Sequence, residues 1–222
     1  MHIIKKNEQI FELVKPYLSD SPFILEAGSF TGHDTLRLAT FWPRGTVHAL
    51  EPVPDIYEQL KNNTLEYPNT YCHQLALSDT TGSAQLYRSE KPNKPGKTTQ
   101  ASSLLAPKER LTHSAIIFPD TITIATTTID AFAAENNINH LDFLWLDLQG
   151  YELPVLQAAP HILPTVKALY CEVQFIESYA GNPLYAEVRA WLEQEGFVMI
   201  ARDFEEGDTK SFFGNILMVR KE

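Results

Sequence analysis

The sequence contains little of what disulfide scaffolds, zinc sites and nucleic-acid interfaces require. Its 222 residues include two cysteines, and neither a C-x-x-C nor an H-x-x-x-H spacing occurs. A disulfide framework and a zinc site are therefore excluded. Basic residues number 18 against 28 acidic ones, which gives a formal net charge of −10. This balance disfavours nucleic acids and anionic membranes as partners, and a neutral or cationic small substrate fits it better.

Long apolar runs are also absent. No stretch approaches the roughly 18 apolar residues of a membrane helix, and the opening segment MHIIKKNEQIFELVKPYL lacks the apolar centre of a signal peptide. Cys72 and Cys171 lie in the strand-like segments TYCHQL and ALYCEVQF, where we expect buried free thiols. These features predict a protein of the reducing cytoplasm. Nothing in the sequence indicates its oligomeric state.

What the chain does contain is a regular alternation of strand-like and helix-like segments. Apolar residues make up 44% and charged residues 21%, which suits one globular domain over residues 1–222 with a helix within residues 1–20. Strands are predicted over 21–28, 45–52, 70–77, 121–126, 140–150 and 166–175, with a further strand after the turn at Gly82. Helices are predicted over 32–42, 53–64, 128–136, 151–163 and 183–196. Two closing strands follow, so the pattern indicates an α/β protein with a mostly parallel sheet covered by helices on both faces.

One segment interrupts this alternation. Residues 90–120 are rich in Pro, Lys, Ser and Thr, and their periodicity is weak. We interpret them as an inserted loop with a short helix near 104–112. Loops of this length inside a compact domain are often lids or binding segments, although a mobile surface excursion is an equally good interpretation.

The stretch FILEAGSFTGHDT carries the strongest functional signal. Gly28 and Gly32 follow the first buried strand and precede a helix, a place where open α/β sheets bind ligands. A dinucleotide fingerprint requires G-x-G-x-x-G, whereas the spacing here is G-x-x-x-G. Glu51 ends the next strand, 23 positions after Gly28, where an acid can accept both hydroxyls of a ribose. The sequence thus keeps the ribose ligand and lacks the pyrophosphate loop.

S-adenosylmethionine matches this combination, because it has a ribose and an adenine but no phosphate. Glu26, directly before the glycine loop, is placed to attract its ammonium group or a water beside it. We therefore expect Glu26 and Glu51 to face one cleft. The alternative is a tight strand–helix turn with no ligand.

Four segments, in order, resemble the FkbM family of S-adenosylmethionine-dependent methyltransferases. They are ILEAGSFTGHDT, VHALEPVPDIYEQLKNN, HQLALSDTTGSAQLY and TTTIDAF…LDFLWLDLQGYELPVLQAA. The resemblance implies a class I methyltransferase, Rossmann-like fold: a seven-stranded, mostly parallel sheet with one antiparallel edge strand. It also implies methyl transfer, usually to oxygen, with S-adenosylhomocysteine as a product and a small molecule or sugar as acceptor.

The chain departs from the family pattern at two positions. Where the family commonly has a lysine and a glutamate, this sequence has Trp145 and Gln149, while the aspartate between them is kept as Asp147. These replacements keep open a non-catalytic module that binds the cofactor without turnover. An NAD(P)-dependent oxidoreductase on a similar sheet is a further alternative, which the G-x-x-x-G loop argues against.

Three residues are candidates for the chemistry. Asp147, at a strand end, is expected to bind the ammonium, orient the acceptor or take its proton, or else to cap the next helix. Glu172 is a second acid or the partner of a buried cation, and Asp147 and Glu172 together are weak candidates for a Mg²⁺ pair. His33 is a base or a solvated helix-start residue.

The expected cofactor and acceptor contacts complete the sequence-based site. Tyr151, Phe175 and Tyr179 are interpreted as walls of an acceptor pocket or as core residues. The expected cofactor-binding residues are Glu26, Gly28, Ser29, Phe30, Gly32, Glu51, Pro52, Ala76, Leu77 and Asp147.

Overall fold

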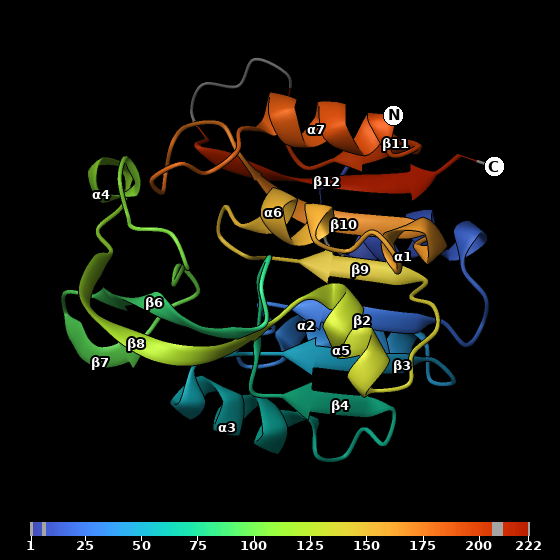
Figure 1. Cartoon of the computed structure of the whole chain (residues 1–222), viewed down its shortest axis with the longest axis horizontal. Helices are drawn as coiled ribbons and strands as arrows, with labels where there is room; N and C mark the ends of the chain where they lie inside the picture. Colours follow the sequence, from blue (N-terminus) through green and yellow to red (C-terminus); the bar gives the residue numbers. More distant parts are fainter. Residues whose placement is uncertain (1, 6–7, 206–210, 222) are drawn as a thin grey trace.

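The computed structural model describes residues 2–5, 8–205 and 211–221. An eight-stranded central sheet runs in the order β1-β11-β12-β10-β9-β2-β3-β4 (Figure 1). Its strands are β1 (His2–Ile3), β2 (Phe23–Ala27), β3 (Thr46–Leu50), β4 (Thr70–His73), β9 (Phe143–Leu146), β10 (Ala168–Gln174), β11 (Phe197–Arg202) and β12 (Phe213–Arg220). The order reverses between β2 and β9, so the switch point lies at the loop after β2.

The predicted α/β class is confirmed, but two details of the sheet are different. Strand β12 is antiparallel to both β10 and β11 and lies between them, so the antiparallel strand is internal and the prediction of an edge strand is wrong. The two-residue strand β1 adds an eighth strand, parallel to β11. The two predicted closing strands are β11 and β12, which pair with each other, and residues 206–210 of their connection lie outside the described residues.

Helices cover both faces of the central sheet. One face packs on α1 (Glu8–Val14) and α2 (His33–Phe41), through Ile10, Leu38 and Trp42 against Phe143 and Trp145. The opposite face packs on α5 (Ile129–Glu135), α6 (Glu152–Gln157) and α7 (Tyr185–Gln194), through Phe132, Leu156 and Leu192 against Leu144 and Leu169. Two 3₁₀ turns are η1 (Lys15–Tyr17) and η2 (Leu163–Thr165). No helix in the described ranges is both long and apolar enough to cross a bilayer.

A second, four-stranded sheet stands beside the carboxyl ends of the central strands (Figure 1). Its order is β5-β8-β6-β7, with β5 (Ala76–Leu77), β6 (Gly82–Lys91), β7 (Lys94–Thr98) and β8 (Ile117–Thr127). Helix α3 (Pro54–Thr64) packs beneath this sheet, because Ile56 contacts Leu86 and Ile124 in one apolar cluster.

The prediction of an inserted loop over residues 90–120 is therefore wrong where strands form, whereas residues 99–109 are irregular and a short helix follows close to the predicted one. The segment contributes β7, the start of β8 and the short helix α4 (Arg110–His113). Most of β7 and the first part of β8 are exposed, so their sequence shows no apolar alternation. Cross-strand pairing with β6, such as Glu90 with Thr98 on β7 and with Ile117 on β8, holds them in place instead.

Candidate active site

The chain turns sharply where β2 ends, because its main chain lies directly against the main chain at the end of β9. Gly28 has a φ of 82°, in the left-handed region. A Cβ on Gly28 would lie 2.0 Å from the carbonyl oxygen of Asp147. The Asp147 amide also donates to the Ala27 carbonyl at 3.0 Å. Glycine at this position lets the end of β2 lie directly against the end of β9.

Gly32 has a different steric reason. It is the N-cap of α2 with a φ of 87°, and a Cβ there would lie 2.8 Å from the Leu60 side chain on α3. Two amides of the same loop, those of Gly28 and Ser29, both donate to the Leu50 carbonyl at 3.1 Å. The G-x-x-x-G spacing therefore serves the packing of the loop as well as the space beside it.

Glu51 is held at the cleft by two main-chain donors. Its Oε2 accepts a hydrogen bond from the Phe30 amide at 3.0 Å, and its Oε1 accepts one from the Val53 amide at 2.9 Å. Burial raises the pKa of Glu51 to about 7, although both hydrogen bonds oppose the rise. Each carboxylate oxygen keeps a lone pair for another donor. The carboxylate is thus prepared to accept two hydroxyls.

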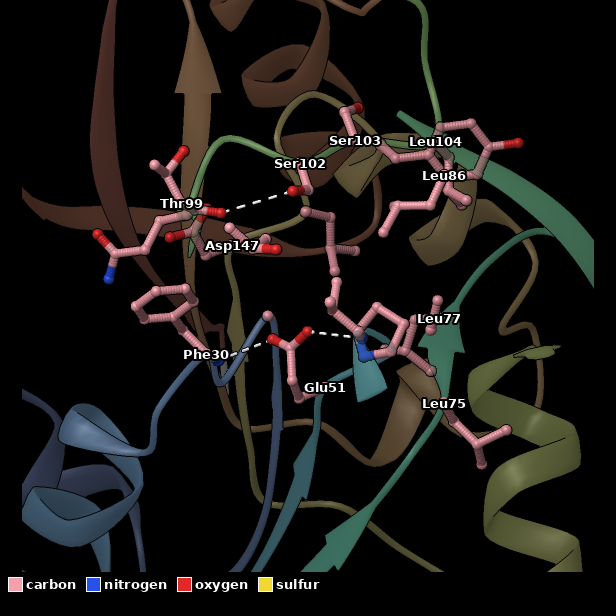
Figure 2. A pocket seen from close by; sticks show the side chains of 18 residues that line it. Phe30, Glu51, Leu75, Leu77, Leu86, Thr99, Ser102, Ser103, Leu104 and Asp147 are labelled. Carbon is pink, nitrogen blue, oxygen red and sulfur yellow. Dashed lines mark hydrogen bonds between the residues drawn. The ribbon is translucent and has the colours of Figure 1, made fainter. Parts of the chain in front are cut away.

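The cleft around Glu51 has the character of a small-molecule site. It contains about 620 Å³ of space, part of it open to solvent. Figure 2 shows Glu51 on one side of this space, with Thr99, Ser102 and Asp147 across from it. The apolar part of the wall is formed by Val53, Leu75, Leu77, Leu86 and Leu104. An apolar wall beside a buried carboxylate suits a flat heterocycle joined to a sugar.

The structure brings most of the predicted cofactor residues together. The cleft is lined by Gly28, Phe30, Glu51, Pro52, Ala76, Leu77 and Asp147. Ser29, Gly32 and Glu26 are not among its lining residues. Ser29 is buried, with its hydroxyl 3.4 Å from the Glu26 carbonyl.

Glu26 occupies a different position from the one expected. It accepts a hydrogen bond at 2.5 Å from the Thr35 hydroxyl on α2. The side chain is 2% exposed, and burial raises its pKa to about 8. Alternation along β2 explains the placement, because Glu26 points to the same face as Ile24, which α2 covers. The expectation that Glu26 and Glu51 face one cleft is therefore not met.

The half-buried Asp147 and the buried Glu172, on neighbouring strands, are joined by one amide. Gln149 Nε2 donates to Asp147 Oδ1 at 2.6 Å and to Glu172 Oε1 at 3.0 Å. Gln174 donates to the same Glu172 oxygen at 2.6 Å. Gln149 has a φ of 52°, uncommon outside glycine, and its Oε1 lies 2.8 Å from the Tyr179 hydroxyl. The position that is commonly glutamate in the family thus bridges two carboxyls here.

The carboxyls of Asp147 and Glu172, which Gln149 joins, both have raised pKa values. Burial raises the pKa of Asp147 to about 6, and Gln149 and Arg110 partly oppose the rise. Burial and the neighbouring Asp147 raise the pKa of Glu172 further above its ordinary value. A pair of this kind holds a proton near neutral pH, which is the requirement for general base or acid work.

A divalent cation does not fit this pair. The Gln149 amide nitrogen lies between the two carboxyls and donates to both. Within residues 2–5, 8–205 and 211–221, no three side chains of His, Cys, Asp or Glu gather as metal ligands. The donor set therefore provides a hydrogen-bond bridge where Mg²⁺ would need oxygen ligands.

Asp147 also borders a second cavity, which adjoins the cleft. This cavity is lined by the side chains of Asp34, Gln100, Arg110, Gln149, Tyr170, Glu172 and Asn215, among others. Trp145, the other departure from the family pattern, also lines this cavity, with its ring centroid 4.3 Å from that of Tyr170. Asp147 is thus the wall between a cleft suited to a cofactor and a polar cavity suited to an acceptor.

The remaining candidates are divided. His33 is exposed and lines neither cavity. Tyr151 lines the cleft and donates to Asp79 at 3.1 Å, whereas Tyr179 is a buried support of Gln149. Phe175 packs against Tyr185 and Phe204 in the core.

Sequence reasoning identified the segment over residues 90–120 as a lid or binding segment but named none of its individual wall residues. These are Thr98, Thr99, Gln100, Ser102, Ser103, Leu104 and Arg110. It missed Leu86 on β6 as well. The segment carries no motif, but it joins lysines with hydroxyl residues over a short span. That composition was the available signal for a polar wall near a ligand.

Comparison with known proteins places this geometry in a family. A model described as "Methyltransferase FkbM domain" matches residues 27–199, which include the glycine loop, Glu51, the second sheet and Asp147. The chain is 25% identical over 185 residues to the 2-O-methyltransferase NoeI of Sinorhizobium fredii (strain NBRC 101917 / NGR234). That alignment covers 82% of this chain and 75% of NoeI.

Solved structures show the same fold at low sequence identity. A methyltransferase FkbM from Methylobacillus flagellatus KT matches with a TM-score of 0.57 and 13% identity, over 91% of this chain and 44% of that one. An rRNA methylase from Streptococcus thermophilus matches with a TM-score of 0.54 and 12% identity, over 99% of both chains.

Proposed function

The chain belongs to the FkbM methyltransferase family, and on that premise we propose that it transfers the methyl group of S-adenosylmethionine to a hydroxyl oxygen of a small molecule or sugar. One observation carries the proposal: Glu51 and Asp147 line one cleft, and Asp147 also borders the polar cavity next to it. Membership in a methyltransferase family sets aside the oxidoreductase alternative. The 2-O-methyltransferase relative supports oxygen as the methyl acceptor.

We assign the cofactor to the cleft between the two sheets. Glu51 would accept the two ribose hydroxyls, and the leucine wall, represented by Leu77 and Leu86, would enclose the adenine. Gly28 lines the cleft beside Asp147, and the methionine end of the cofactor would lie along this part of the wall. Glu26 then acts indirectly, by holding α2 and the loop through Thr35.

The bound cofactor supplies an electrophilic methyl group on a sulfonium whose leaving group is neutral. The protein has to position the acceptor oxygen in line with that methyl and to take up the hydroxyl proton. We assign the proton to Asp147, supported by Glu172 through the Gln149 bridge. With a pKa of about 6, Asp147 is mostly ionised at neutral pH and able to accept the proton.

The acceptor would lie in the cavity that Asp147 shares with Glu172 and Arg110. Its polar lining suits a hydroxylated molecule rather than a hydrocarbon. We also place the protein in the cytoplasm, since Cys72 and Cys171 are free and Cys171 is fully buried.

Calorimetry and a turnover assay test the proposal with one substitution. The protein should bind S-adenosylhomocysteine with one-to-one stoichiometry. It should also convert S-adenosylmethionine into S-adenosylhomocysteine when a hydroxylated acceptor is supplied. Asp147→Asn should retain that binding and lose turnover by about 10²–10⁴-fold, the typical contribution of a general base. A protein that binds neither S-adenosylmethionine nor its product would overturn the assignment.

A further inference from the structure

A strongly basic pocket adjoins the proposed cofactor cleft. Lys91, Lys94, Lys97 and Arg110 line it, and no acidic residue is part of its described lining. It shares Phe30, Thr98 and Thr99 with the cleft and Gln100 with both neighbouring cavities. Four cations therefore surround one space in a chain whose net charge is −10.

Arg110 is the innermost of these cations. Its residue surface is 8% exposed, and its Nε and Nη1 have no hydrogen-bond partner among the described residues. The rings of Phe212, Phe213 and Tyr179 lie 4.9, 5.7 and 5.9 Å from the guanidinium carbon. These rings stabilise the cation but leave its Nε and Nη1 donors without acceptors, which is costly unless a ligand supplies them.

The lysines are equally without neutralising partners. Lys91 and Lys94 are direct cross-strand partners in the β6–β7 hairpin, an arrangement in which like charges destabilise the pair. In the part of the chain that the structure describes, none of the three lysines forms an ion pair. An anion bound between them would remove this repulsion.

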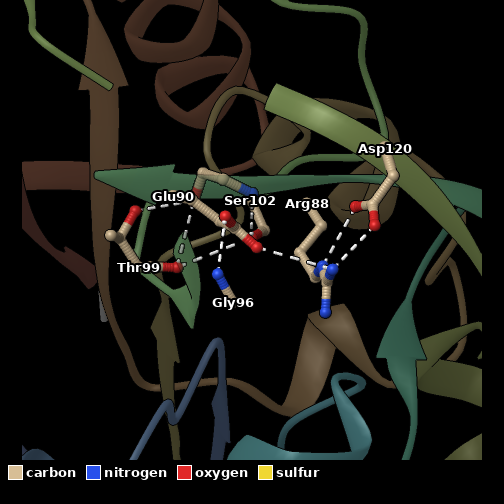
Figure 3. A network of polar contacts seen from close by, with 7 residues as sticks. Arg88, Glu90, Gly96, Thr99, Ser102 and Asp120 are labelled. Carbon is tan, nitrogen blue, oxygen red and sulfur yellow. Dashed lines mark hydrogen bonds and ion pairs between the residues drawn. The ribbon is translucent and has the colours of Figure 1, made fainter. Parts of the chain in front are cut away.

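The acids of the hairpin are committed elsewhere (Figure 3). Glu90 accepts a hydrogen bond from the Gly96 amide at 2.9 Å and lies 3.5 Å from Arg88. Arg88 in turn donates to both oxygens of Asp120, at 3.0 and 2.6 Å. This network fixes the hairpin turn and leaves the positive charge of the lysines in the pocket.

We propose that this pocket binds a phosphate group carried by the methyl acceptor, so that the acceptor is a phosphorylated or nucleotide-linked sugar. Arg110 borders both the basic pocket and the cavity with Asp147, so it joins the phosphate to the reacting hydroxyl. Arginine with several lysines suits the two negative charges of a phosphate better than the single charge of a carboxylate. The inference rests on the proposed function.

A small acceptor fits better than RNA. Nucleic-acid binding relies on a basic surface that follows several phosphates. Here the cations line one pocket of limited size, and the chain as a whole carries ten more acidic than basic residues. The phosphate chemistry is shared by both ligands, so the test must separate them.

Calorimetry on the protein saturated with S-adenosylhomocysteine provides the test. The probes are inorganic phosphate, glucose 1-phosphate and glucose. We expect both phosphates to bind and glucose not to bind. Lys94→Glu combined with Lys97→Glu should weaken phosphate binding by at least about tenfold. The control, Lys15→Glu with Lys221→Glu, makes the same charge change on two exposed lysines outside the pocket and should stay within about twofold.

Each outcome decides one point. If the unaltered protein binds S-adenosylhomocysteine but neither phosphate, the basic pocket is not an anion site while the proposed function stands. If it does not bind S-adenosylhomocysteine, the proposed function fails first. If the control pair weakens phosphate binding equally, the effect comes from net charge alone, and the proposal is overturned. If a short RNA binds more tightly than glucose 1-phosphate, and its binding depends more strongly on salt, the proposal of a small acceptor is overturned.

Discussion

Replacing Glu51 by glutamine should weaken binding of S-adenosylhomocysteine by roughly two orders of magnitude. The Glu51 carboxylate accepts amides from Phe30 and Val53 and still offers a lone pair on each oxygen. Two ribose hydroxyls bound there are charge-assisted donors worth about 1.5–3 kcal/mol each. Glutamine retains one acceptor oxygen and turns an amino group toward one of the two main-chain amides. The expected loss is about 2–4 kcal/mol, or roughly 30- to 1,000-fold in Kd.

The pKa of Glu51 provides a second signature in the same experiment. Because the pKa of Glu51 in the ligand-free protein is about 7, its carboxyl is mostly protonated at pH 6 and mostly ionised at pH 8. A ribose that donates both hydroxyls requires the ionised form. Affinity should therefore fall as pH drops below 7, and binding near neutral pH should release a proton. In the glutamine variant this pH dependence should disappear.

Calorimetry at pH 8 is the assay, since the carboxylate is then fully available. Glu58→Gln is the matched control, because it makes the same chemical change on the exposed side of α3. The control should bind within about twofold of the unaltered protein. If Glu51→Gln stays within about threefold as well, and the affinity of the parent is flat between pH 6 and 8, the ribose assignment is refuted.

Two further predictions concern stability. Gln149→Glu replaces an amide donor by a third acid between Asp147 and Glu172, and urea titration should show a loss of about 1–3 kcal/mol in the free energy of unfolding. The second concerns pH: burial raises the pKa values of Glu26 and Glu152 to about 8, so the folded protein holds protons that the unfolded chain, with values near 4.5, releases. The free energy of unfolding of the ligand-free protein should therefore fall as pH rises from about 5 to 8.

Controls for these two experiments come from the same chain. Gln59→Glu, on an exposed helix position, should leave stability almost unchanged. Glu26→Gln should flatten the fall with pH, whereas a profile already flat in the parent would contradict the buried protonated acids. His48 works in the opposite direction at lower pH. Burial lowers its pKa from 6.5 to about 4, so stability should decline as pH falls through that window.

The sequence was sufficient for the features that depend on local order. Glu51 and Asp147 could be placed at the cleft because each ends a buried strand of a parallel sheet, and such ends meet at one edge. Glu26 was misplaced although it ends a strand too. Its orientation depends on alternation along β2, where Leu25 and Ala27 face one layer of helices and Glu26 faces the other.

The second sheet could be predicted only in part, for a different physical reason. The strand after Gly82 and the alternation over residues 121–126 indicate β6 and the later part of β8, but β7 and the first part of β8 are mostly exposed and show no apolar alternation. The pairing of β6 with β8 also joins residues as far apart as Gly82 and Thr126. Arg110 reaches the site only because α4 docks on residues 177–178 through main-chain hydrogen bonds. Contacts of this kind depend on the folded arrangement of distant segments rather than on local pattern.

The division of the site between two sheets has a consequence for how specificity is able to change. The wall with Glu51 and Gly28 belongs to the central sheet, whereas the basic wall belongs to the β6–β7 hairpin of the second sheet, where residues 91–97 are exposed. Exchange of residues 91–98 for a hairpin of other charge would therefore retarget the enzyme toward new acceptors while its methyl donor stays the same. Protein design and evolution could therefore both alter the acceptor by changing this hairpin, without altering the cofactor site.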